Sequence, residues 1–161
     1  MKRGLFLTLE GVDGCGKSTQ LSRLTKYLEK KGLDVLLTRE PGGCAISEQV
    51  REMLLSPENK EMSAETEMLL YAAARTQHIT EKILPALEAG KVVLCDRYLD
   101  SSIAYQGFGR GLGDMVAEVN RIATGGVEPD LTIFLNITPA AGMARKNRQD
   151  GHVLDRLEQE K

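Results

Sequence analysis

The sequence predicts an α/β fold built on a parallel sheet, and three observations support this prediction. Four short apolar runs have the composition of strands, and each is apolar nearly throughout, which is typical of strands covered on both faces. Segments with helical periodicity separate these runs. The alternation of strand and helix indicates parallel strands joined by crossover helices. We expect ligands to bind beyond the carboxyl ends of such strands.

The expected strands are residues 5–9, 35–38, 92–95 and 131–135. The first expected helix covers residues 17–31, where Leu21, Leu24 and Leu28 form one apolar stripe and Gly32 can end the helix. Later helices are expected at 47–55, 64–89 and 114–123. Pro85 is expected to kink or break the helix that contains it, and Thr138-Pro139 resembles the start of a further helix.

Composition limits the possible classes of protein. The 161 residues favour a single domain, 1–161, with room for a core, and 42% hydrophobic and 27% charged residues are ordinary for a soluble globular protein. A net charge of -2 gives no indication of a nucleic-acid or membrane partner. The three scattered cysteines fit neither a disulfide framework nor a zinc site, and they favour a cytoplasmic location.

A glycine-rich segment between the first strand and the first helix predicts a phosphate-binding loop. Two glycines five residues apart, Gly11 and Gly16, precede Lys17 and Ser18. Such glycines let backbone N–H groups surround phosphate oxygens, while the lysine reaches the outer phosphates and the hydroxyl binds Mg²⁺. The alternative is a flexible turn with an exposed lysine. The expected nucleotide-binding residues are Gly11, Val12, Asp13, Gly14, Cys15, Gly16, Lys17, Ser18 and Thr19.

A second polar signal follows the third expected strand. Asp96 is placed to hold Mg²⁺ through water together with Ser18, and Arg97 can bind phosphate with two parallel hydrogen bonds. The alternative is a strand-end aspartate that caps a turn. The chain shows no Asn-Lys-x-Asp segment and no Asp-x-x-Gly at this strand, which argues against a GTP switch. Phosphoryl transfer to a small molecule is the remaining interpretation.

Six segments in order resemble the bacterial thymidylate kinase family. They are "EGVDGCGKST" (10–19), "TREPGG" (38–43), "LLYAAAR" (69–75), "VVLCDRYLDSSIAYQG" (92–107), "PDLTIFLNITP" (129–139) and "DRLEQE" (155–160). The resemblance implies a doubly wound P-loop fold of the nucleoside monophosphate kinase type with at least four strands. It also implies ATP-dependent phosphorylation of dTMP to dTDP in dTTP biosynthesis, with ATP and Mg²⁺ as cofactors and a homodimer built on helices around 45–80 and 114–123.

The resemblance also implies a set of acceptor-binding residues. Asp13 corresponds to the residue that binds the sugar 3′-hydroxyl and helps to organise Mg²⁺, and Arg97 to the one that binds the acceptor phosphate. Tyr105 corresponds to a residue that crowds the sugar 2′ position. The remaining members border the cavity or bind the base, and they are Glu40, Pro41, Arg51, Ser102 and Gln106.

Tyr71 and Arg75 are four residues apart on an expected helix and therefore share one face. In similar enzymes these positions stack on thymine and bind its O4 atom. An aromatic core residue beside a surface arginine is the alternative.

The segment around 140–155 is expected to form a flexible lid. It contains Arg145 and Arg148, with Arg156 just beyond it, in a polar, glycine-containing stretch. The phosphate loop itself has no arginine, so the resemblance favours a lid arginine as catalytic, with Arg148 the first choice. A solvated charged turn is the alternative, and His78 and His152 are expected on the surface.

Two departures from the family pattern affect these expectations. Cys44 follows "REPGG", where a hydroxyl or apolar residue is usual, and the chain ends at Lys161, where similar proteins continue. We therefore expect a C-terminally incomplete kinase domain. The rival functions are another small-molecule kinase, such as a deoxynucleoside kinase, and a nucleotide-binding module without transfer chemistry.

Overall fold

The computed structural model describes residues 3–146 and 156–157. The described residues fall into two compact units. The described residues of unit 1 lie within Met1–Arg39, Ile83–Tyr98 and Glu128–His152, and those of unit 2 lie within Glu40–Lys82, Leu99–Val127 and Val153–Lys161.

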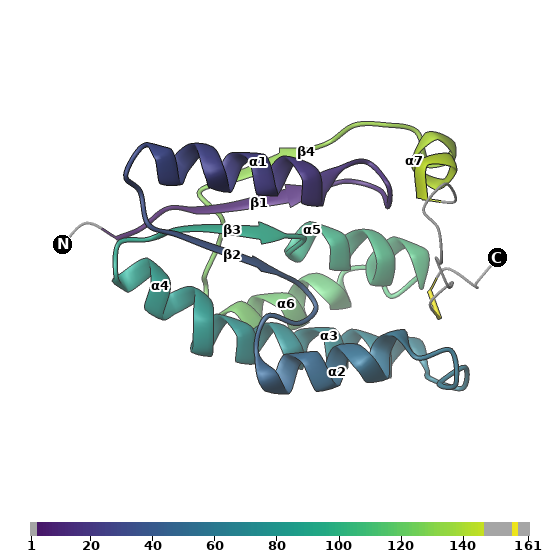
Figure 1. The fold of residues 1–161 in the computed structure, drawn as a ribbon. Coiled ribbons are helices and arrows are strands. Elements are labelled where there is room, and N and C mark those ends of the chain that lie inside the picture. Colours follow the sequence, from purple (N-terminus) through teal and green to yellow (C-terminus); the bar gives the residue numbers. More distant parts are fainter. Residues whose placement is uncertain (1–2, 147–155, 158–161) are drawn as a thin grey trace. The chain divides into compact units, whose positions relative to one another are not determined.

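Unit 1 contains a four-stranded parallel sheet, which confirms the predicted fold class. The strands are β1 (Phe6–Glu10), β2 (Val35–Arg39), β3 (Val92–Asp96) and β4 (Leu131–Phe134), in the order β2-β3-β1-β4 (Figure 1). The central strands are in register from Phe6 opposite Val93 to Leu9 opposite Asp96. The carboxyl ends of all four strands therefore meet at one edge of the sheet, where the predicted nucleotide-binding residues lie.

Helix α1 (Lys17–Lys30) covers one side of the core of this sheet. Its predicted apolar stripe is confirmed, because Leu21 belongs to the cluster of buried Leu9, Val92 and Leu94, with Leu24 and Leu28 packed beside it. Each fully buried leucine contributes about 1.5–3 kcal/mol of transfer free energy. Unit 1 also contains α4 (Leu84–Glu88) and α7 (Pro139–Lys146).

The expectation that all strands are covered on both faces is wrong for the two edge strands. Strands β1 and β3 are almost fully buried, but Leu37 of β2 is 47% exposed, and Leu131 and Phe134 of β4 are 53% and 63% exposed. The described part of the chain does not cover these side chains, and single exposed apolar side chains are normal on protein surfaces. Apolar composition alone does not distinguish a buried central strand from a partly exposed edge strand.

Unit 2 is helical. It comprises α2 (Ala45–Leu55), α3 (Ala64–His78), most of η1 (Ile79–Ile83), α5 (Leu99–Ser102), η2 (Ile103–Gly109) and α6 (Met115–Thr124). Ser63 caps the N-terminus of helix α3, because its side chain accepts a hydrogen bond from the Thr66 N–H. The helix packs against α2, α6 and η2. The glycine pair predicted to end α6 does so, with Gly125 in the left-handed conformation.

The long helical pattern over 64–89 is confirmed, but its irregular point differs from the prediction. Helix α3 runs into the π-helical turn η1 and then into α4 without a break, and Pro85 lies in the first turn of α4. The wider π-helical turn thus directly precedes Pro85, which has no N–H to donate to the turn before it. The second π-helical segment, η2, has no counterpart in the sequence prediction.

Candidate active site

The phosphate loop connects β1 to α1 in unit 1, as the motif predicts. Gly11 has φ +142°, and a Cβ atom there would lie 2.8 Å from the Leu135 carbonyl oxygen, so a side chain does not fit. Gly16 precedes the first turn of α1 with φ 103° and caps it without a side-chain hydrogen bond. The first N–H groups of α1 are therefore available to an anion, and the helix dipole favours a negative charge at this end.

Lys17 and Ser18 occupy the first turn of α1. The buried Lys17 Nζ donates hydrogen bonds to the carbonyl oxygens of Gly11 at 3.0 Å and Val12 at 3.4 Å. The Ser18 hydroxyl donates to Asp96 Oδ2 at 3.2 Å. The other carboxylate oxygen, Asp96 Oδ1, is buried and has no hydrogen-bond partner among the described residues. A hydroxyl next to a carboxylate with an unused oxygen is the kind of site that Mg²⁺ prefers.

Asp13 and Arg97 form an ion pair beside this loop. Arg97 Nη2 lies 2.5 Å from Asp13 Oδ1, and Lys146 Nζ lies 3.5 Å from Asp13 Oδ2. Burial alone would raise the pKa of Asp13, but the positive charges of Arg97 and Lys146 outweigh it and hold the pKa below its usual value. Asp13 is therefore ionised at neutral pH and holds two cations beside the phosphate loop.

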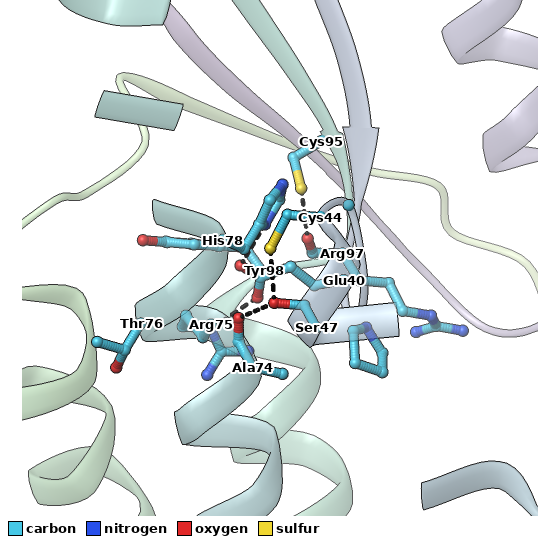
Figure 2. Close-up of polar contacts among 12 residues, drawn as sticks. Glu40, Cys44, Ser47, Ala74, Arg75, Thr76, His78, Cys95, Arg97 and Tyr98 are labelled. Carbon is cyan, nitrogen blue, oxygen red and sulfur yellow. Dashed lines mark hydrogen bonds and ion pairs between the residues drawn. The ribbon is translucent and has the colours of Figure 1, made fainter. Parts of the chain in front are cut away.

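Arg97 has φ 70°, the left-handed region that a residue with a side chain seldom adopts. Its N–H donates to the Leu9 carbonyl, and its own carbonyl accepts from the Cys95 thiol at 3.2 Å (Figure 2). The surrounding backbone thus fixes the unusual conformation, which is typical of functional positions.

Helix α7, the described part of the expected lid, touches the phosphate loop directly. A Cβ atom on Gly142 would lie 2.2 Å from the Asp13 carbonyl oxygen, and one on Gly14 would lie 2.1 Å from the Gly142 carbonyl oxygen. The two backbones can approach this closely only because both residues are glycine. Arg145 is exposed on this helix, and Arg148, the predicted catalytic arginine, lies outside the described residues.

In unit 2, Arg75 and Glu40 form a buried ion pair (Figure 2). Arg75 Nε donates to Glu40 Oε2 at 2.7 Å, and its other nitrogens donate to Ser102 Oγ at 3.0 Å and to Asn120 Oδ1. His78 is fully buried, with Nδ1 3.1 Å from Glu40 Oε1, so its expected surface position is wrong. The sequence prediction failed because the carboxylate that accompanies this histidine is 38 residues away in the chain.

Gln106 belongs to a second buried group in unit 2, centred on Glu67. Gln106 Nε2 donates to Glu67 Oε1 at 2.7 Å, and Arg110 and Arg156 donate to Glu67 Oε2 at 2.7 and 2.6 Å. Arg156 is 4% exposed and also donates to the Leu54 carbonyl. Its expected place among the polar lid arginines is therefore wrong, because these hydrogen bonds attach the buried guanidinium to α2 and α3.

The remaining predicted acceptor residues lie within unit 2 as follows. Arg51 Nη1 donates to the Pro41 carbonyl at 2.9 Å, which ties α2 to the segment after β2. Tyr71 is half-buried on α3, and Tyr105 is 39% exposed on η2. Cys44 is buried and lies 3.0 Å from the hydroxyl of Ser47, which in turn donates to the Ala74 carbonyl (Figure 2).

Comparison with known proteins decides the family. The sequence profile described as thymidylate kinase matches residues 9–161. A thymidylate kinase of Geobacillus sp. is 51% identical over 159 residues, which cover 98% of this chain and 76% of that protein. One of Bacillus cytotoxicus is 54% identical with the same coverage.

This chain belongs to the thymidylate kinase family. A crystal structure of thymidylate kinase from Ehrlichia chaffeensis matches with a TM-score of 0.79 at 36% identity, covering 89% of this chain and 82% of that one. The expected nucleoside monophosphate kinase type of fold is thereby confirmed.

For this member of the thymidylate kinase family, sequence analysis missed three charged or polar residues of the site. Lys146 pairs with Asp13, Asn120 with Arg75, and Glu67 with Gln106. Glu67 could have been predicted from its spacing, because it precedes Tyr71 by four residues and Arg75 by eight. It therefore lies on the same face of α3. Asn120 could not have been predicted in this way, since its partner Arg75 is 45 residues away.

Among the described helices, none combines the length and apolar character that a membrane span requires.

Proposed function

We propose a division of roles among the described residues for the reaction of this family, the ATP-dependent phosphorylation of dTMP to dTDP. The phosphate loop and Arg97 bind phosphates, and Arg75 with its neighbours binds the base. The observation that carries the proposal is the phosphate loop, in which Lys17 and Ser18 follow a glycine turn whose first residue, Gly11, has no room for a side chain.

On the donor side, the amides of the loop and Lys17 bind the ATP phosphates. Asp96 Oδ1, buried and without a hydrogen-bond partner in the described part of the chain, and the neighbouring Ser18 hydroxyl fit Mg²⁺. These two residues would hold it, Asp96 through water. When bound, Mg²⁺ neutralises charge on the donor phosphates. The proposed nucleotide-binding set is that of the motif, Gly11 to Thr19.

On the acceptor side, Arg97 binds the phosphate of dTMP, and Asp13 binds the sugar 3′-hydroxyl. The left-handed backbone of Arg97 and its pairing with Asp13 support these roles, because both groups are held in place before the ligand binds. A guanidinium matches phosphate geometry better than an ammonium group does.

The base is bound by residues of unit 2. Tyr71 stacks on thymine, Arg75 binds its O4 edge, Ser102 and Gln106 bind its polar edge, and Tyr105 crowds the 2′ position. The burial of Arg75 among Glu40, Ser102 and Asn120 supports this role, because its guanidinium cannot change conformation without breaking ionic and polar contacts. Glu40, Pro41 and Arg51 border the acceptor, and the bond from Arg51 to Pro41 supports that grouping.

The chemistry needs no covalent enzyme intermediate. An oxygen of the dTMP phosphate attacks the γ-phosphorus of ATP in line, the bond to the β-phosphate oxygen breaks, and ADP leaves. Lys17 and Arg97 stabilise the charge that develops on the transferred group. Residues 140–155 act as a lid that excludes water and adds positive charge. Arg148 is the proposed catalytic arginine, and Lys146 is a further lid cation, supported by its pairing with Asp13.

We also propose a homodimer and a cytoplasmic location. Helices α2, α3 and α6 carry exposed apolar side chains, which supports an interface on these elements: Ile46, Met53, Leu69 and Ile122. All three cysteines are free thiols, which suits a reducing compartment. Sedimentation that shows only monomer at micromolar concentration would contradict the dimer.

A coupled assay for ADP tests the function. We expect turnover with dTMP to exceed turnover with dUMP, AMP and CMP, and equal rates for all acceptors would contradict the proposed acceptor. Lys17→Met should lower kcat by about 10²-fold or more, a typical loss for one group that stabilises developing charge. Lys26→Met, an exposed lysine on the same helix, is the matched control and should leave kcat unchanged.

A further inference from the structure

Glu67 is a buried carboxylate that three side chains from distant parts of unit 2 contact. It is 1% exposed and accepts hydrogen bonds from Gln106 Nε2 at 2.7 Å, from Arg110 Nε and Nη2 at 3.2 and 2.7 Å, and from Arg156 Nη2 at 2.6 Å. Burial alone would raise its pKa, but these hydrogen bonds outweigh it, so the pKa of Glu67 lies below its usual value. Glu67 is therefore an anion at neutral pH.

An ionised carboxylate can only accept hydrogen bonds, and this fixes which end of the Gln106 amide faces it. The Gln106 NH₂ group must point to Glu67, so the amide oxygen must point away. That oxygen, Gln106 Oε1, is buried and has no hydrogen-bond partner among the described residues. A buried acceptor without a partner costs about 1–3 kcal/mol, which a ligand that donates a hydrogen bond can recover.

We infer that Glu67 is a positioning residue for acceptor choice: it holds the Gln106 amide so that its oxygen accepts from an N–H donor on the base. This inference rests on the proposed function, in which Gln106 binds the polar edge of thymine. Thymine and uracil carry an N–H at N3. Cytosine carries a lone pair at N3, so this nitrogen and the Gln106 amide oxygen, both of them acceptors, would face each other. Glu67 thereby favours dTMP over dCMP without touching either nucleotide.

The variant Glu67→Gln tests the inference, because an amide at position 67 can donate as well as accept and no longer fixes the orientation of Gln106. Calorimetry measures the affinities of wild type and variant for dTMP, dUMP and dCMP, which carry the same phosphate and sugar. We expect the ratio of dTMP to dCMP affinity to fall by about 10- to 100-fold. The ratio of dTMP to dUMP affinity should stay unchanged, since both bases donate from N3. A merely structural defect would lower all three affinities together.

Arg110→Met is the matched control. It removes another partner of Glu67 but leaves the Glu67–Gln106 bond intact, so both ratios should keep their wild-type values. A folded Glu67→Gln protein with the wild-type ratio of dTMP to dCMP affinity would overturn the inference while leaving the proposed function standing. A wild type that binds dTMP no better than dCMP would overturn both.

A measurement on the wild type covers the case in which Glu67→Gln does not fold. In protein labelled with ¹³C and ¹⁵N, the side-chain carbonyl signal of Gln106 should shift on adding dTMP, while its NH₂ signals stay at the positions of a carboxylate-bound amide. A change of the NH₂ signals with a constant carbonyl signal would show the opposite orientation and overturn the inference.

Discussion

Nε of Arg75 lies 2.7 Å from Oε2 of Glu40, and the two side chains are only 2% and 3% exposed. The second oxygen of the same carboxylate lies 3.1 Å from His78, so one anion holds two side chains of α3. A buried charge of this kind is tolerated only while its partners are in place. The ion pair therefore determines both the conformation of Arg75 and part of the stability of unit 2.

Removal of the carboxylate should destabilise the protein strongly. Glu40→Leu removes the carboxylate that pairs with the buried Arg75 cation, and we expect the free energy of unfolding to fall by about 3–5 kcal/mol. Urea unfolding measures this change. Arg3→Ala is the control, since it breaks an exposed ion pair with Asp130 and should cost about 1 kcal/mol or less. Similar losses for the two variants would contradict the prediction.

Replacement of Asp96, the carboxylate at the end of β3, should weaken the use of Mg²⁺. We expect Asp96→Asn to raise the Mg²⁺ concentration needed for half-maximal turnover by about 10-fold or more, because a neutral amide orients metal-bound water less well. Titration of activity with Mg²⁺ measures this. Asp100→Asn alters an exposed carboxylate a few residues away and should leave the titration unchanged. An unaltered Mg²⁺ requirement in Asp96→Asn would argue against this site.

Acid should remove the stabilisation that Glu67 provides. The pKa of Glu67 is lowered in the folded protein from an ordinary value of 4.5, so the folded state favours the anion. The stabilisation is fully present above the ordinary pKa and disappears as the pH falls through the lowered one. In urea unfolding, the stability difference between wild type and Glu67→Gln should therefore be constant near neutral pH and shrink in acid. A difference that grows in acid would show that the pKa is raised instead.

A methyl group on α7 should separate it from the phosphate loop. In an ordinary helix, the substitution of glycine by alanine raises the free energy of unfolding by about 0.5–1 kcal/mol. In Gly142→Ala, however, the added Cβ would lie 2.2 Å from the Asp13 carbonyl oxygen, and overpacking costs about 1–3 kcal/mol. We expect lower kcat and no gain in melting temperature.

Gly109→Ala is the control for this change, because the nearest atom to its added Cβ lies at an ordinary 3.5 Å. It should leave kcat unchanged. Full activity in Gly142→Ala would show that the contact between α7 and the loop is dispensable.

The parts of the site that follow one another in the chain could be predicted from sequence. The phosphate loop is specified by Gly11, Gly16, Lys17 and Ser18, because its shape depends on local backbone freedom. The four strands and the main helices follow from periodicity for the same reason. The two π-helical turns could not be predicted, since the residues of η1 are ordinary in an α-helix, and the two glycines of η2 weaken a helix without indicating a π-helical turn.

The sequence by itself determined the strands and helices, the phosphate loop and the family, because each element and each motif is formed by residues close together in the chain. Only the tertiary structure decided that His78 is buried, that Arg156 anchors the chain on Glu67 instead of belonging to the lid, and that Gln106 has a fixed orientation. These outcomes depend on ion pairs and hydrogen bonds between residues 38 to 89 positions apart. The energy of such contacts comes from burial and from the partner's charge, and neither is a property of the local sequence.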